Sequence, residues 1–141
     1  MSATYIPARL RRAVISRALQ CCENCWTPDD APLVAHEVDH VIAERHKGKT
    51  ELANLAYACF RCNRLKGSDL SSIDPQTGTI TRLYNPRTDR WIEHFRLLTD
   101  AAIVAQSAIG RTTLDFLDMN DPELRGLRGV LMQQGRYAPP S

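Results

Sequence analysis

Hydrophobic positions near the start of the chain recur with the period of a helix. Between residues 8 and 20 they fall on one stripe of a helix, and arginines occupy positions away from it. The members of this stripe are Leu10, Val14, Ala18 and Leu19. Pro7 stands where a helix can begin, because its missing N–H donor would lack a partner there in any case. The pattern predicts an amphipathic helix over residues 8–20.

After this helix the pattern changes to short apolar runs separated by polar segments. Residues 33–42 and 52–58 are two such runs, the first rich in valine and isoleucine, and both predict strands. The polar segment 43–51 predicts the loop that joins them. Residues 59–68 predict a helix that ends near Gly67, since glycine is the residue that most readily follows a helix.

The second half of the chain mixes strand-like and helical segments. We expect a strand at 79–84, extended chain at 91–98 and 101–105, and helices at 110–117 and from about 122 to 134. Asp121 and Pro122 suit the cap and first turn of the last helix, and Gly135 suits its end. Together the segments predict an α+β fold.

The size of the chain predicts one domain. Its 141 residues, 43% hydrophobic and 24% charged, suffice for a single modest core over residues 1–141. We divide it into a core at about 20–70 and a C-terminal extension at about 71–141. Neither a membrane span of roughly 20 apolar residues nor a secretory signal is apparent. We therefore expect a cytoplasmic protein.

Five cysteines in a reducing compartment predict a metal site rather than disulfides. Two Cys-x-x-Cys pairs, Cys22 with Cys25 and Cys59 with Cys62, supply four thiolates, the closed tetrahedral set of a structural zinc. Cys21 is a spare thiol, because its spacing to Cys25 is one residue too long. Chance pairing of buried cysteines and a rubredoxin-like iron site are the alternatives. With no open position, such a metal would support folding rather than catalysis.

Titratable and amide side chains interrupt the apolar pattern between the cysteine pairs. Burying Asp39 and His40 without partners would be costly, whereas a second metal and a phosphate would supply partners. A neutral imidazole suits a general base near pH 7, so His40 is the candidate base. Asp39 and the amide oxygen of Asn63 suit a hard divalent cation, and Asn54 is placed to bond across the loop and orient His40.

One feature of this interpretation conflicts with regular strand geometry. Neighbouring residues of a strand point to opposite faces, so the side chains of Asp39 and His40 should diverge. His36 and Val38 would instead share the face of His40. Both Asp39 and His40 can serve one phosphate only if the strand ends, twists or bulges at this point.

These residues resemble the HNH endonucleases of the ββα-metal fold, also called treble-clef or His-Me finger. The resemblance runs from Cys22 to Gly67 and covers the zinc-stapled form: a Cys-x-x-Cys, a strand ending in Asp-His, an Asn-Leu, and a Cys-x-x-Cys-Asn helix start. The last motif position is asparagine rather than histidine, and Ala43 stands where many members have proline. The segment after Gly67 resembles the tail of small stand-alone bacterial or phage members.

The resemblance implies a mechanism as well as a fold. His40 would be the general base, Asp39 and Asn63 would bind Mg²⁺ or Mn²⁺, and Asn54 would be the structural asparagine. The substrate would be DNA, and the product would carry a 5′-phosphate. The fold would be a ββα-metal core with a structural zinc, an N-terminal helix and a C-terminal α/β extension.

The remaining polar residues carry weaker expectations. Three basic residues lie on the predicted helix beside the metal site, and we expect at least one to contact phosphate. They are Arg61, Arg64 and Lys66. We expect His46 to be exposed, His94 to pack in the fold, and Glu37 to point away from His40 in a structural role. His36 either approaches the phosphate or packs.

Two functions other than a nuclease remain open from the sequence. A non-catalytic, zinc-stapled nucleic-acid-binding module would keep the cysteines and the basic residues, but it has no need for Asp39, His40 and Asn63 together. An iron protein for electron transfer would need only the cysteines.

Overall fold

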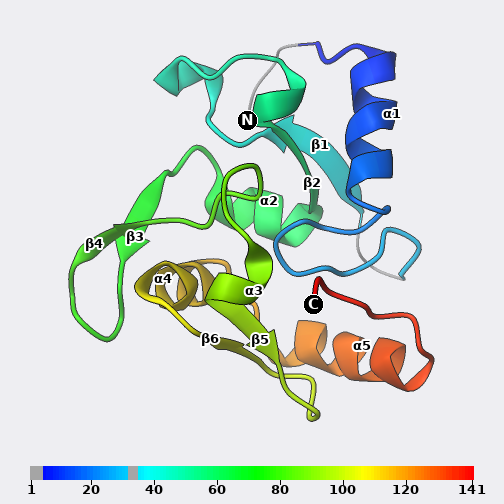
Figure 1. The fold of residues 1–141 in the computed structure, drawn as a ribbon, viewed down its shortest axis with the longest axis vertical. Helices are drawn as coiled ribbons and strands as arrows, with labels where there is room; N and C mark the ends of the chain where they lie inside the picture. Colours follow the sequence, from blue (N-terminus) through cyan, green and yellow to red (C-terminus); the bar gives the residue numbers. More distant parts are fainter. Residues whose placement is uncertain (1–4, 32–34) are drawn as a thin grey trace. The chain divides into compact units, whose positions relative to one another are not determined.

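The computed structural model describes residues 5–31 and 35–141 and divides the chain into two compact units (Figure 1). The first unit contains the residues up to Ser68 together with Asn85–Thr88, and the second contains Asp69–Tyr84 and Asp89–Ser141. The boundary after Ser68 lies close to the predicted start of the C-terminal extension. Whether the whole chain behaves as a single domain stays a prediction.

The first unit consists of a helix, a strand pair and a second helix. Its elements are α1 (Ala8–Arg17), β1 (His36–His40), β2 (Leu55–Cys59) and α2 (Phe60–Lys66), with 3₁₀ turns at Glu44–His46 and Leu52–Asn54. Strands β1 and β2 are antiparallel, and their register pairs His36 with Cys59 and His40 with Leu55. The order β1, β2, α2 is the ββα arrangement that the resemblance implies.

A small apolar core joins α1 to the strand pair. Val14 and Ala18 are fully buried and pack with Val38, Leu55 and Tyr57. The stripe predicted from the sequence is therefore the buried face of α1, except for Leu19. Leu19 has a positive φ of 55° and is 74% exposed, because the helix has already ended at Arg17.

Strand boundaries differ slightly from the prediction. The first strand begins at His36 rather than residue 33, and residues 33 and 34 lie outside the described part of the chain. The second apolar run starts with the 3₁₀ turn Leu52–Asn54 and only then becomes β2. Helix α2 ends as predicted, with Gly67 at a positive φ of 55°.

The segment Asn85–Thr88 is tied to the first unit by a buried ion pair. The carboxylate of Glu23 accepts a hydrogen bond from the guanidinium of Arg87 and another, of 2.9 Å, from the backbone N–H of Tyr57. Glu23 is 5% exposed, so both of its oxygens have partners inside the unit. This ion pair explains why Asn85–Thr88 belong to the first unit, although the residues before and after them belong to the second.

The second unit contains two strand pairs and three helices. Its elements are β3 (Ser71–Ile73), β4 (Ile80–Arg82), α3 (Trp91–His94), β5 (Phe95–Leu97), β6 (Ile103–Ala105), α4 (Ala108–Phe116) and α5 (Pro122–Gln133). Strand β3 pairs with β4, and β5 pairs with β6, both antiparallel. Asp121 caps α5 as predicted, with its carboxylate accepting the N–H groups of Glu123 and Leu124.

One prediction in this unit was wrong in part, and one strand was not predicted. Residues 91–94 form a helical turn rather than extended chain, because this turn brings the rings of Trp91 and Phe95 to 5.2 Å in the core. Strand β3 was missed, since its three residues are polar or exposed and have no apolar alternation.

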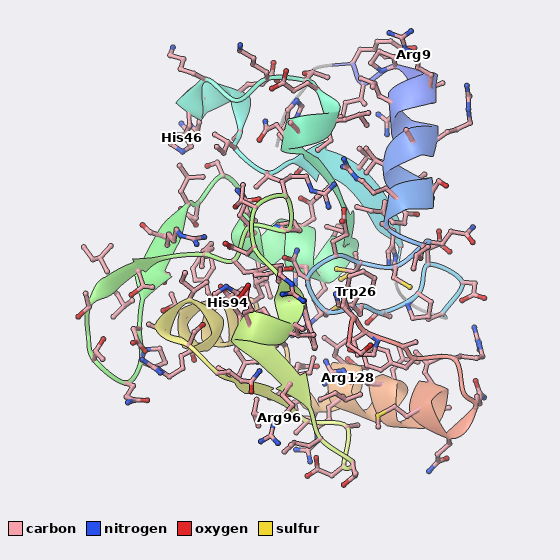
Figure 2. All side chains as sticks on the ribbon, in the orientation of Figure 1. Arg9, Trp26, His46, His94, Arg96 and Arg128 are labelled. Carbon is pink, nitrogen blue, oxygen red and sulfur yellow. The ribbon has the colours of Figure 1, made fainter. Side chains whose placement is uncertain are left out.

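Arg128 of α5 (Figure 2) is 1% exposed and donates to the carbonyl oxygens of Ala101 and Met119.

Taken together, the elements form a small mixed α/β fold with short antiparallel strand pairs and five described helices. None of the described helices combines the length and the hydropathy that crossing a membrane requires.

Candidate functional site

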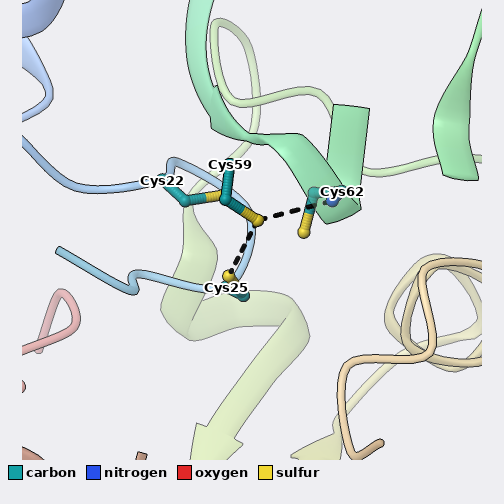
Figure 3. A group of neighbouring side chains, drawn as sticks. All are labelled: Cys22, Cys25, Cys59 and Cys62. Carbon is teal, nitrogen blue, oxygen red and sulfur yellow. Dashed lines mark hydrogen bonds between the residues drawn. The ribbon is translucent and has the colours of Figure 1, made fainter. Parts of the chain in front are cut away.

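Four buried cysteine sulfurs converge in the first unit (Figure 3). Cys22, Cys25, Cys59 and Cys62 place their Sγ atoms within 4.8 Å of one another, and Cys25 Sγ lies 3.8 Å from Cys59 Sγ. Zinc–sulfur bonds of about 2.3 Å in a tetrahedron separate the sulfurs by about 3.8 Å. The cluster therefore has the spacing of a structural zinc site, as the cysteine pattern predicts.

Local backbone geometry prepares this cluster. Cys22 and Cys25 lie on a turn after α1, in which the N–H of Cys22 donates to the carbonyl of Thr27 at 2.9 Å. Cys59 ends β2 and caps α2, where its sulfur accepts the N–H of Cys62 at 3.4 Å. Cys21 is only half-buried and contacts the carbonyl of Leu19 instead, so it remains outside the cluster.

The pKa values of two of these thiols shift in opposite directions. Burial raises the pKa of Cys22 well above its ordinary value. Hydrogen bonds from Cys22, Cys59 and Cys62 lower the pKa of Cys25 well below it. Four thiolates in one buried cluster need a bound cation to balance their charge.

A second group of polar side chains lies at the face of β1 that is opposite Val38 and His40. Asp39 and Asn63 line a hollow of about 210 Å³ together with Glu37, Phe60, Arg64 and Gly67. The carboxylate of Asp39 is 25% exposed, and its Oδ1 accepts the N–H of His40 at 2.8 Å. Its Oδ2 accepts no hydrogen bond from the residues that the structure describes. This oxygen is therefore available to a ligand.

Asn63, on α2, lines the same hollow, and we call Asp39 Oδ2 and Asn63 Oδ1 the oxygen pair. Its amide nitrogen donates to Oε2 of Glu37 at 3.2 Å, while Oδ1 has no partner within the described chain. A carboxylate oxygen and an amide oxygen are the donors that a hard divalent cation prefers. The residues present therefore fit such an ion, with Glu37 as a nearby third source of negative charge.

The imidazole of His40 lies close to the Asp39 member of this oxygen pair. Its Nε2 is 2.8 Å from Oγ1 of Thr50, and its Nδ1 is 3.8 Å from Oδ1 of Asp39. The His40 side chain is 1% exposed, and Nδ1 has no hydrogen-bond partner among the described residues. An unpaired buried nitrogen is costly, and such atoms occur where a ligand or water completes the site.

The strand geometry accommodates both residues. His40 faces the buried side of β1 with Val38, while Asp39 is half-buried on the opposite side, as alternation requires. Because β1 ends at His40, the carboxylate of Asp39 turns to cap the N–H of His40 and comes close to its ring. No bulge is needed; the end of the strand is enough.

Asn54 closes the loop that follows His40. Its Oδ1 accepts the N–H of Ile42, and its Nδ2 donates to the carbonyls of Ile42 and Lys49, each at 2.9 Å. A Cβ built on Gly48 would lie 1.6 Å from the carbonyl oxygen of Ile42, so only glycine fits. Asn54 therefore bonds across the loop and holds its backbone, without touching the His40 ring itself.

The basic residues of α2 differ in their surroundings. Arg64 is exposed, and its guanidinium lies 5.5 Å from the centroid of the Phe60 ring at the hollow. Lys66 donates from Nζ to the carbonyl of Val41 at 2.8 Å, so it also supports the fold. Arg61 is half-buried. Arg64 is thus the most accessible of the three basic side chains.

The other histidines lie away from the oxygen pair. Nε2 of His36 is 2.8 Å from the carbonyl of Thr27, and its ring packs on Tyr57 at 5.2 Å. His46 (Figure 2) is exposed as expected, with Nε2 3.1 Å from the carbonyl of Ser68. We expected His94 to pack in the fold, and its Nδ1 lies 2.6 Å from Oγ of Ser107 within the second unit (Figure 2).

Sequence reasoning missed two residues at this site. Glu37 was expected to be structural, yet it lines the hollow and bonds Asn63; its two-residue spacing from Asp39 is the signal that places both on one strand face. Thr50 gave no signal, since a threonine in a polar loop is ordinary. Only the folded loop brings it to His40.

Comparison with protein-family models identifies an HNH endonuclease match over residues 22–69, about a third of the chain. No curated protein and no solved structure was found to match. The match begins at Cys22 and ends just after α2, so it covers the four clustered cysteines, which we call the cysteine tetrad, and the oxygen pair. The family suggests nuclease activity on DNA with a divalent metal. Residues 22–69 therefore match the HNH endonuclease family model, have the ββα order that this family implies and hold a cysteine cluster that fits a structural zinc.

Proposed function

We propose that this domain is a metal-dependent endonuclease that hydrolyses phosphodiester bonds of DNA, with His40 as general base and Asp39 and Asn63 as ligands of Mg²⁺ or Mn²⁺. The observation that carries the proposal is the closeness of a buried, unpaired ring nitrogen to a partly exposed carboxylate. Nδ1 of His40 lies 3.8 Å from Oδ1 of Asp39, and Asn63 lines the same hollow as Asp39.

In the proposed reaction, Nδ1 of His40 takes a proton from water, whose oxygen attacks phosphorus in line with the departing oxygen. A divalent cation, when bound, would neutralise the negative charge of the phosphate and of the leaving oxygen. Asp39 and Asn63 would bind this cation close to His40. The product of such a cleavage carries a 5′-phosphate, as the family resemblance implies.

The cysteine tetrad takes no part in the chemistry that we propose. Four thiolates fill a tetrahedral ion and leave no position for water or phosphate. A zinc ion held by the four cysteines would instead tie the turn at Cys22 and Cys25 to the start of α2, which carries Asn63. Its contribution is therefore to fix the helix on which one of the proposed catalytic ligands lies.

Phosphate binding is the proposed role of the basic side chains on α2. Arg64 is exposed at the hollow and is the first candidate, with Arg61 and Lys66 beside it. Because a cluster of thiols persists only in a reducing compartment, we propose that the protein acts in the cytoplasm. These assignments predict salt-sensitive DNA binding.

Nicking of supercoiled plasmid in the presence of Mg²⁺ or Mn²⁺ tests the proposal. Loss of a general base typically lowers a rate by about 10²–10⁴-fold, so His40→Ala should retain DNA binding and zinc but lose cleavage to that extent. His46→Ala is the matched control, because that ring is exposed and lies outside the oxygen pair.

The alternatives give different outcomes. A non-catalytic binding module would retain plasmid but never nick it, with any divalent ion, in a folded and zinc-loaded preparation. A rubredoxin-like protein would be coloured and contain iron, whereas we expect a colourless protein with about one zinc per chain.

A further inference from the structure

We propose that Thr50 is a positioning residue for His40: its hydroxyl holds Nε2 and thereby makes Nδ1 the nitrogen that accepts the proton. The inference rests on the proposed function for its catalytic consequence. The hydrogen bond itself is testable without any cleavage.

The two ring nitrogens of His40 have different surroundings. Nε2 lies 2.8 Å from Thr50 Oγ1, which is hydrogen-bond distance. Nδ1 has no partner in the described chain and faces the side of Asp39, 3.8 Å from its Oδ1. Rotation of the ring by half a turn about the Cβ–Cγ bond would place ring carbons where both nitrogens now lie, and the bond to Thr50 opposes that rotation.

Thr50 is itself held in place. Its neighbour Lys49 offers its backbone carbonyl to Nδ2 of Asn54 at 2.9 Å, and Gly48 folds tightly against Ile42. The Thr50 hydroxyl has no other hydrogen bond within the described residues, so the ring of His40 is its one partner there. Asn54 therefore acts on His40 through the loop and through Thr50.

The chemistry gives this bond a specific use. For Nδ1 to take a proton from water, it must hold a lone pair, so the hydrogen of the neutral ring must lie on Nε2 and point to Oγ1. When the O–H bond of water breaks and an N–H bond forms at Nδ1, Nε2 keeps its hydrogen and the same bond to Thr50 persists. The hydroxyl does not reorient during the step, which is the advantage of a preorganised partner.

Two variants separate this role from packing. Thr50→Val keeps the shape of the side chain and removes the hydroxyl, whereas Thr50→Ser keeps the hydroxyl. Loss of a hydrogen-bonded orienting partner typically costs about 10–100-fold. We expect Thr50→Val to lower the single-turnover cleavage rate by that factor, with DNA affinity in Ca²⁺, zinc content and thermal stability close to wild type, and Thr50→Ser to restore most of the rate.

Nitrogen-15 NMR of histidine-labelled protein supplies a readout that needs no activity. In the metal-free protein the Nε2 resonance of His40 should move in Thr50→Val and stay in Thr50→Ser. With Mg²⁺ bound, Nε2 should carry the hydrogen and Nδ1 should not. Unmoved resonances, a hydrogen on Nδ1 in the Mg²⁺ form, or wild-type cleavage by Thr50→Val would each overturn the inference. Absence of cleavage by wild type would instead overturn the proposed function and leave the metal-free NMR test of the hydrogen bond standing.

Discussion

The two polar clusters of the first unit are built on opposite principles. The cysteine tetrad is fully buried, and every sulfur lies within reach of every other. In the group formed by Asp39, Asn63 and His40, the first two side chains are partly exposed and the third is buried, and each member leaves one polar atom without a partner in the described chain. A closed set of ligands stabilises a fold, whereas an open set reserves its interactions for a substrate. Polar atoms without partners lower the stability of the fold. The cysteine cluster, at the other end of the same strand pair, offsets this loss when it binds a metal ion.

Removing one tetrad ligand should have the largest effect. Structural zinc contributes about 10–16 kcal/mol in small zinc domains, which matches or exceeds the roughly 5–15 kcal/mol stability of a whole domain. We therefore expect Cys59→Ser to lose zinc and to unfold the first unit, as measured by zinc content and hydrogen exchange. Cys21→Ser should retain both, because that sulfur lies outside the cluster. A folded, zinc-free Cys59→Ser protein would break the distinction between the two clusters.

Substitution of Gly48 should have the next largest effect on stability. The new Cβ would overlap the Ile42 carbonyl, and overpacking against rigid backbone costs about 3 kcal/mol. We expect Gly48→Ala to lower the free energy of unfolding by that amount and to reduce cleavage, because the loop carries Thr50. Gly126→Ala is the control: nothing lies within 4 Å of its Cβ, so stability should rise by about 0.5–1 kcal/mol. Equal stabilities for the two variants would contradict the loop geometry.

Changing a ligand of the open set should alter activity and leave the fold almost unchanged. Asp39→Asn preserves an oxygen to accept the His40 N–H but removes the charge that we assign to cation binding. We expect cleavage to fall by at least about 10²-fold, with an unfolding free energy within about 0.5 kcal/mol of wild type. Denaturant unfolding and single-turnover cleavage measure the two quantities. A strongly destabilised variant would show that Asp39 belongs to the structural cluster.

The smallest effect is expected at Glu37. Its carboxylate is exposed and bonds the Asn63 amide, so Glu37→Gln removes charge near the cation but keeps an acceptor. Exposed charges interact by at most about 1 kcal/mol, which corresponds to about fivefold. The Mg²⁺ concentration for half-maximal cleavage should rise by about that factor. A loss as large as that of Asp39→Asn would make Glu37 a direct ligand.

The parts of this structure that the sequence predicted are those with local patterns. The stripe of α1, the two apolar runs, the end of α2 at Gly67 and the cysteine spacing all depend on near neighbours in the chain, and all are confirmed in outline. The turn at Trp91 failed because an aromatic pair of the core, rather than a propensity, decides it. Thr50 was invisible because its contact with His40 depends on how a polar loop folds back.

A crystal of the zinc-loaded protein grown with Mn²⁺ would test the central claim most directly, since anomalous scattering distinguishes the two metals. The account predicts zinc at the cysteine tetrad and a separate manganese ion within about 2–2.5 Å of side-chain oxygens of Asp39 and Asn63, beside Nδ1 of His40. Manganese bound elsewhere, in a protein that cleaves DNA with Mn²⁺, would contradict it.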